Sequence, residues 1–216
     1  TRSLAGFLPS ALATSLFGLS LLQVQAADFL SPENRGPRSY VVSTQDPKAT
    51  EAFLPQLGKV RVMVARAITK LTGKNTVPEA WRSLVTTQAV VGIKVFSAPG
   101  PNSGTRPAVV AAVVEGLLAA GLPPKHIIVW DRQAADLRLA GFFELSDRYH
   151  IRVAGSAQAG WDEKASYNPD SPILGNLIWG DLEFGKKGDG VGRKSFVSKL
   201  VSREMTKIIN VTPLLN

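Results

Sequence analysis

The sequence predicts an α/β domain with a mainly parallel sheet, helices that cover it as βαβ units, and three layers. Residues 90–96 form an apolar, β-branched run, which is typical of a strand covered on both faces. Residues 106–120 are apolar around most of the helical circumference, so this helix is expected to pack against the sheet. Residues 127–130 form a second apolar strand, and a right-handed crossover makes it parallel to the first.

A linker and two helices are expected before this unit. Residues 27–55 are rich in Pro, Ser, Asn and Arg and are interpreted as a linker or N-terminal extension. Apolar residues recur at helical spacing over 57–71, and Gly73 is expected to end that helix. Pro78 suits the first turn of the short helix that follows.

The pattern after the βαβ unit is less regular. Gly141 is expected to stop a short helix that begins near Ala134. The remaining segments are interpreted, in order, as a short strand over 151–153, a long loop over 155–172, a helix over 195–203 and a last strand over 207–211.

Composition describes a globular protein with an excess of positive charge. The chain of 216 residues is long enough for one well-buried domain with extensions, and 44% hydrophobic with 19% charged residues excludes a disordered chain. The net charge of +8 favours anionic partners. The Lys and Arg residues are scattered rather than arranged in a stripe with stacking aromatics, which argues against nucleic-acid binding.

Cysteine is absent, and this excludes several chemistries within the chain. There are no disulfides, thiol nucleophiles, zinc–thiolate sites or cysteine-ligated iron–sulfur clusters. With two histidines, a metal would need carboxylate ligands and would be a hard ion such as Mg²⁺ or Ca²⁺. Asp181 and Glu183 with Asp131 or Asp170 are candidates, although solvated surface carboxylates are the alternative. No metal ligand and no cofactor are assigned.

The first 26 residues are interpreted as a signal peptide. Arg2 precedes an apolar run over 4–22, and small residues near Ala26 suit cleavage. A membrane anchor is the alternative, but Pro9 and several glycines make a poor spanning helix. We therefore expect an exported protein, periplasmic or extracellular, with no stable membrane span after cleavage. The sequence does not indicate an oligomeric state.

Polar residues end or nearly end three of the predicted strands. Lys94 lies near the end of the first, Asp131 follows the second, and Asn210 lies near the end of the last. In open α/β sheets, ligands bind at the edge formed by the carboxyl ends of parallel strands. These three side chains are therefore expected to share one crevice.

The loop after the first strand is the second part of the expected site. Residues 97–104 are rich in Gly, Pro and Ser, and they deliver Gly104, Thr105 and Arg106 to the start of the helix. Free N–H groups and the helix dipole favour an anion at such a point. These three residues are therefore candidates for ligand binding together with the strand ends.

The roles of these residues remain open between two alternatives. In the first, Lys94 and Arg106 bind phosphate or carboxylate, with Asp131 as hydrogen-bond acceptor, base or metal ligand. In the second, Lys94 and Asp131 form a structural ion pair and Thr105 is only an N-cap. No catalytic residue is assigned, and whether the protein is an enzyme stays open.

Several motifs in this order resemble a known family. They are a strand ending in Lys94, a Gly/Pro loop, Thr105 with Pro107, a helix ending at Ala120-Gly121, and a strand ending in Asp131. This combination resembles the domain-of-unknown-function family 362 (DUF362) over most of residues 81–216. The resemblance implies the α/β fold and not a reaction, because the family's activity is itself unsettled.

The chain departs from the family pattern at two points. Phe96 stands where the family commonly has Asn, which removes a polar group from the edge. The family continues beyond the last strand with a Lys/His-containing loop, so we interpret residues 56–216 as a single α/β domain truncated at its carboxyl end. Some relatives carry ferredoxin-like iron–sulfur domains, but this chain has no cysteine to hold such a cluster.

Two functions are consistent with the sequence. The first is an exported domain that binds a small anionic ligand at the carboxyl edge of its strands, with metal-assisted catalysis left open. The second is a non-enzymatic basic extracellular module that binds acidic polymer or an envelope protein. The run over 185–195 is rich in glycine but lacks a phosphate-loop glycine before Lys194, so it is interpreted as a turn. The basic module would bind through the side chains of this run: Lys186, Lys187, Arg193 and Lys194.

Overall fold

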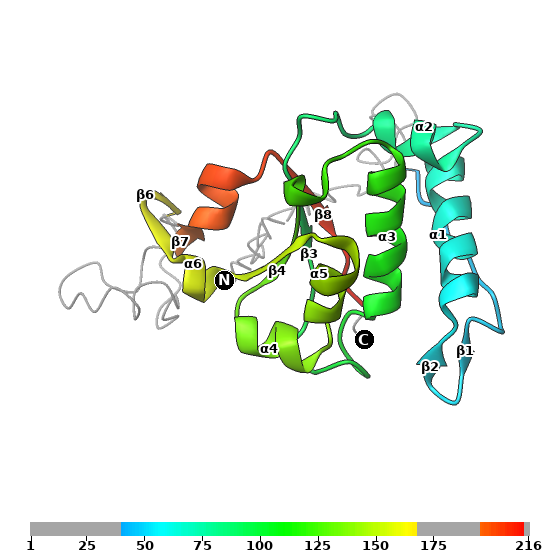
Figure 1. The fold of residues 1–216 in the computed structure, drawn as a ribbon, viewed down its shortest axis with the longest axis horizontal. Coiled ribbons are helices and arrows are strands. Elements are labelled where there is room, and N and C mark those ends of the chain that lie inside the picture. The colour runs from blue at the N-terminus through cyan, green and yellow to red at the C-terminus, as the bar shows by residue number, and fades with distance from the viewer. Residues whose placement is uncertain (1–39, 168–194, 214–216) are drawn as a thin grey trace, which may run out of the picture. The chain divides into compact units, whose positions relative to one another are not determined.

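A computed structural model describes residues 40–167 and 195–213. The chain divides into two units, residues 1–40 and 41–216, and every element described below belongs to the second. Its centre is a four-stranded parallel sheet in the order β5-β4-β3-β8 (Figure 1). The strands are β3 (Val91–Lys94), β4 (Ile127–Asp131), β5 (Arg152–Gly155) and β8 (Lys207–Asn210). The predicted α/β fold with a parallel sheet is confirmed.

Helices from the βαβ connections cover one face of the sheet. The connecting helices are α3 (Pro107–Ala119) after β3, then α4 (Ala134–Leu139) and α5 (Phe143–Tyr149) after β4. Side chains alternate along a strand, so Val91 and Ile93 share this face, and both lie in one core cluster with Leu117 of α3. The outer helices α1 (Leu57–Thr72) and α2 (Val77–Arg82) pack on α3, and Figure 1 shows α1 beside it.

The chain returns to β8 along the opposite face. The return segment contains α6 (Ser156–Ala159), β6 (Trp161–Tyr167), its antiparallel partner β7 (Ser195–Ser198) and the π-helix η4 (Leu200–Glu204). Gly92 points away from α3 because it alternates with Val91 and Ile93. A β-carbon on Gly92 would lie 2.1 Å from Sδ of Met205, so Met205, just after η4, packs directly on this face. The sheet is therefore the middle of three layers.

Two stretches differ from the prediction. The sequence predicts a loop over 155–172, but residues 156–167 form α6 and β6, and the rest lies outside the described residues. The sequence predicts a helix over 195–203, but this stretch forms β7 and most of η4. Ser198 of β7 pairs with Trp161 of β6. Pairing with a strand distant in sequence outweighs the local helical spacing that suggested a helix.

Local sequence signals determine the ends of the helices, and the N-terminal extension contains a short pair of strands. Gly73 ends α1 with a left-handed φ of 66°, and Gly141 follows α4 with a φ of 84°, both as predicted. Pro78 lies in the first turn of α2. The predicted linker over 27–55 contains a small antiparallel pair, β1 (Thr50–Glu51) with β2 (Leu54–Pro55).

A polar network joins three helices on the face of the sheet that α3 covers. Glu115 of α3 accepts a bidentate pair of hydrogen bonds from the Arg61 guanidinium of α1 and a third from the Tyr149 hydroxyl of α5. The Arg61 hydrogen bonds lower the pKa of Glu115 more than partial burial raises it. Burial and the Glu115 carboxylate together raise the pKa of Tyr149. The carboxylate therefore stays ionised at neutral pH and links the helical layer.

Trp81 of α2 packs against α3 at a glycine. The indole is buried, and a β-carbon on Gly116 would lie 2.2 Å from its Nε1. Glycine inside a helix costs about 1 kcal/mol relative to alanine, so its presence here has a packing reason. Gly116 provides the space that the Trp81 ring occupies.

We expect Gly116→Ala to lower the free energy of unfolding by about 1–3 kcal/mol, because the added methyl group must displace a buried indole. Gly58→Ala in α1 is the matched control, since a β-carbon there meets nothing within 4 Å. That control should leave stability unchanged or raise it by up to about 1 kcal/mol through helix propensity. Urea denaturation measures both, and an equal effect of the two substitutions would contradict the packing argument.

Candidate functional site

The predicted cation and carboxylate meet at the carboxyl edge of the sheet. β3 and β4 are parallel, with Lys94 in register with Trp130. Lys94 Nζ lies 2.7 Å from Asp131 Oδ1 and also donates a hydrogen bond to the carbonyl oxygen of Val95. The same ammonium lies 5.7 Å from the centroid of the Trp130 ring. The structure therefore brings Lys94 and Asp131 together.

The second oxygen of Asp131 is also fully engaged. Asp131 Oδ2 accepts hydrogen bonds of 2.7 Å from both the backbone N–H and the hydroxyl of Ser97. Burial would raise the pKa of Asp131, but the hydrogen bonds from Lys94, Ser97 and the Arg132 backbone outweigh it and hold the pKa below 3.8. A carboxylate in this state is a poor general base. Its role here is to hold the ammonium and the start of the loop.

Thr105 does not cap the helix. Arg106 occupies the N-cap position of α3, and no side-chain hydrogen bond caps the helix there. The Thr105 hydroxyl instead accepts from the Phe96 N–H at 2.9 Å and donates to the Val211 carbonyl at 2.6 Å. The expected N-cap is therefore wrong. The loop therefore folds back over the strand ends, and the buried Thr105 hydroxyl bridges the chain just beyond β3 and the chain just beyond β8.

Gly104 and Arg106 shape the loop. A β-carbon on Gly104 would lie 2.3 Å from the carbonyl oxygen of Phe96, so only glycine fits where the loop crosses the strand end. Arg106 Nη1 donates to the Pro101 carbonyl at 2.7 Å and to Asn102 Oδ1 at 3.3 Å. Within the described residues, Gly104 and Arg106 thus hold the loop.

Asn210 completes the edge on the other side of Lys94. The two residues are in register across the parallel pair β3 and β8, so their side chains leave the same face of the sheet. Asn210 is exposed, and the Lys94 side chain is 30% exposed. β3 continues into α3 on one face, whereas the chain enters β8 from the opposite face. This is the topological switch point at which open α/β sheets bind ligands.

The described part of the chain contains no group of ligands for the hard metal ion that the sequence leaves open. There, no three His, Asp or Glu side chains gather as a metal site. Asp131, which the sequence offers as a ligand, uses both oxygens within the protein. Asp170, Asp181 and Glu183 lie outside the described residues, as do all but the last residue of the basic run over 185–195.

Ser97 is the site residue that sequence reasoning missed. Its two hydrogen bonds to Asp131 are as short as the ion pair itself. A serine that follows a buried strand and opens a Pro/Gly loop is a usable signal, because its hydroxyl and N–H project together at the strand end. The carboxylate partner, however, comes from a strand 34 residues away.

Comparison with family models, curated proteins and solved structures finds no match to this chain. The fold and the site define a class, which is an α/β domain with a parallel sheet and a lysine–aspartate ion pair at its carboxyl edge. The resemblance to the domain-of-unknown-function family stays a prediction. Among the helices of residues 40–167 and 195–213, none combines the length and the apolar character that a membrane span requires.

We expect Asp131→Asn to lower the free energy of unfolding at pH 7 by roughly 3 kcal/mol, because it leaves the Lys94 ammonium without its charge partner. The wild-type pKa is lowered by folding, so this stabilisation is complete above the ordinary value of 3.8 and is lost as pH falls toward the folded-state value. The variant should therefore lose less stability than the wild type between pH 5 and pH 2.

Urea denaturation across this pH range measures the effect. Asp147→Asn is the control, because Asp147 is exposed on α5 and forms no ion pair within the described residues. Parallel pH profiles for the wild type and Asp131→Asn would contradict the role of this carboxylate.

Proposed function

We propose that this domain binds a small anionic molecule, a carboxylate or phosphate, at the carboxyl edge between β3 and β8. The observation that supports the proposal is the state of Lys94. Its ammonium is held by Asp131 and the Val95 carbonyl, yet the side chain is 30% exposed at the switch point of the sheet. An ammonium has three N–H donors, so one remains for a ligand.

Asn210 supplies the second contact in this proposal. It lies beside Lys94 on the same face and is exposed, so its amide can donate to another oxygen of the anion. Two donors at a fixed spacing suit the oxygens of one carboxylate or phosphate group. Thr105, Gly104 and Arg106 shape the crevice by holding the loop and the strand ends.

Asp131 is a positioning residue in this proposal. Both of its oxygens accept hydrogen bonds, and its pKa is lowered, so the carboxylate fixes the ammonium and takes no proton near neutral pH. The proposal is therefore one of binding, and it includes no catalytic step. The export predicted from residues 1–26 and the family resemblance are parts of the same proposal.

The alternative function, a basic module for acidic polymer, depends on Lys186, Lys187, Arg193 and Lys194, which lie outside the described residues. No observation in the described residues favours it over the crevice. The two functions differ in their dependence on salt. A multivalent polymer contact weakens steeply with ionic strength, whereas a single anion held by two directed donors weakens less.

We expect calorimetric titration with inorganic phosphate and with succinate to detect binding to the wild-type chain. Asn210→Ala should lower the affinity for either anion about tenfold, which corresponds to the loss of one hydrogen bond. It should leave the free energy of unfolding unchanged, because the side chain is exposed. Lys94→Met should reduce binding further.

Lys125→Met is the control for Lys94→Met. Lys125 is exposed and lies just before β4, at the opposite end of the strands from the crevice. Its substitution should leave anion affinity within twofold of the wild type. If Asn210→Ala and Lys94→Met bind both probes as tightly as the control, the proposed site is wrong.

A further inference from the structure

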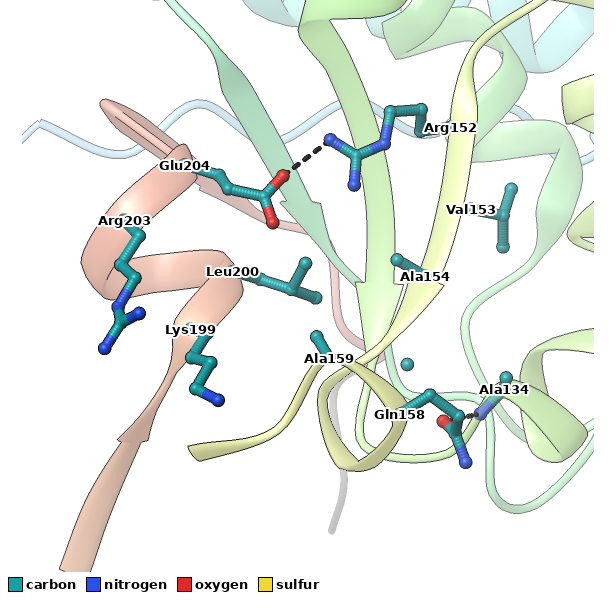
Figure 2. A pocket seen from close by; sticks show the side chains of 11 residues that line it. Ala134, Arg152, Val153, Ala154, Gln158, Ala159, Lys199, Leu200, Arg203 and Glu204 are labelled. Atoms are coloured by element: carbon teal, nitrogen blue, oxygen red, sulfur yellow. Dashed lines mark hydrogen bonds and ion pairs between the residues drawn. The ribbon is translucent and has the colours of Figure 1, made fainter. Parts of the chain in front are cut away.

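The open edge of the sheet, at β5, carries a cavity. It is a groove of about 600 Å³ beside β5, within the range of roughly 300–1,000 Å³ that is usual for small-molecule sites. Figure 2 shows its two walls: β5 and α6 on one side, and the chain from Lys199 to Glu204 on the other. None of Lys94, Asp131 and Asn210 lines it, so it is separate from the candidate site at the carboxyl edge.

Four charged side chains line the groove, and two of them pair with each other. Arg152 Nη1 lies 2.6 Å from Glu204 Oε2, as the dashed line in Figure 2 marks. Both side chains are more than one third exposed, so the pair contributes little stability. It does cancel the charges of one cation and one anion within the groove.

The Asp162 carboxylate balances the charge of Arg203, another cation of the groove. Arg203 donates to Asp162 through Nε at 2.9 Å and Nη2 at 3.0 Å, and Ser202 donates to the same carboxylate at 2.8 Å. The hydrogen bonds from Arg203 and Ser202 hold the pKa of Asp162 well below its ordinary value. The carboxylate is therefore ionised, and the charge of Arg203 is balanced.

Lys199 is the cation that remains. It has no carboxylate partner within residues 40–167 and 195–213. Its backbone N–H donates to the Gly160 carbonyl at 2.9 Å, and its Nζ would lie 3.3 Å from a β-carbon on Gly160. The ammonium is thus held near the turn after α6, and Figure 2 shows it between the two walls. Among the residues that the structure describes, Lys199 is therefore the cation of the groove that no carboxylate balances.

Small apolar side chains form part of the remaining lining. Ala154 of β5 and Ala159 of α6 present methyl groups to the space between the walls, and the Leu200 side chain, which is 1% exposed, lies beneath them at the other wall. Val153 alternates with Ala154 and packs against the core cluster on the opposite face. Gln158 uses its Oε1 to accept the N–H of Ala134 at 3.0 Å, which fixes the end wall of the groove. An apolar surface beside a single ammonium is complementary to a molecule with an apolar body and one negative charge.

We propose that this groove binds an amphiphilic monoanion, a carboxylate with a compact hydrocarbon or aromatic body. The carboxylate pairs with Lys199, and the body lies against Ala154 and Ala159. Charge balance selects a monoanion, because the two guanidiniums already have carboxylate partners. The methyl groups beside Lys199 favour an anion with an apolar body over a small hydrated one, because such a body removes their surface from water.

Calorimetric titration of the full chain with octanoate, acetate and octylamine tests the proposal. We expect octanoate to bind at least tenfold more tightly than acetate, because its additional methylene groups leave water. Octylamine, which has the same body and the opposite charge, should bind at least tenfold more weakly than octanoate. Octanoate affinity equal to that of acetate or of octylamine would overturn the proposal.

Variants locate the binding. Lys199→Met should lower the affinity for octanoate at least tenfold. Ala159→Glu should lower it as much, because it places a carboxylate in the groove. Lys164→Met, on β6 and outside the lining, is the control and should bind as the wild type does. Unchanged octanoate affinity in both groove variants, with circular dichroism confirming that they fold, would overturn the site.

The two proposed sites fail separately. Lys94→Met and Asn210→Ala should leave octanoate affinity unchanged, while Lys199→Met should leave phosphate affinity unchanged. Loss of octanoate binding in Lys94→Met, with the fold intact, would place the anion in the crevice and overturn the inference about the groove.

Discussion

The Asp131 carboxylate is the constraint on which the carboxyl edge depends. It is buried and charged, and such a group is tolerated only when its hydrogen-bond capacity is filled. Lys94 fills it from β3, and Ser97 fills it from the first residues of the loop. One side chain of β4 therefore fixes the direction of a lysine and the departure of the loop, and the loop in turn delivers Thr105 to the end of β8.

The central part of the fold could be predicted because its signals are local. Apolar runs of strand length, separated by an apolar helix, leave few arrangements once right-handed crossover is imposed. The meeting of Lys94 with Asp131 follows from the same argument, since parallel neighbours end at one edge. Of the two roles left open for this pair, the structure shows the ion pair. It also shows an ammonium that is still partly exposed, so the two roles are compatible.

The remainder depends on partners that lie far apart in the sequence. β7 is a strand because β6 pairs with it, and nothing within residues 195–203 reveals that partner. Thr105 is an N-cap by residue type, but its hydroxyl instead bonds two backbone groups that need a partner, the Phe96 N–H and the Val211 carbonyl. The groove beside β5 combines residues from four separate segments. Its charge balance exists only once the carboxylates Asp162 and Glu204 have been placed.

The two candidate sites present their cations in different ways, and this bears on what each can select. Lys94 is fixed in direction by a carboxylate that also cancels its charge, so an incoming anion gains from directed donors more than from net charge. Lys199 has no such carboxylate in the described residues, so its attraction is Coulombic and less dependent on direction. The carboxyl edge is therefore suited to selection by the geometry of an oxyanion. The groove is suited to selection by charge and by the apolar body that its lining can cover.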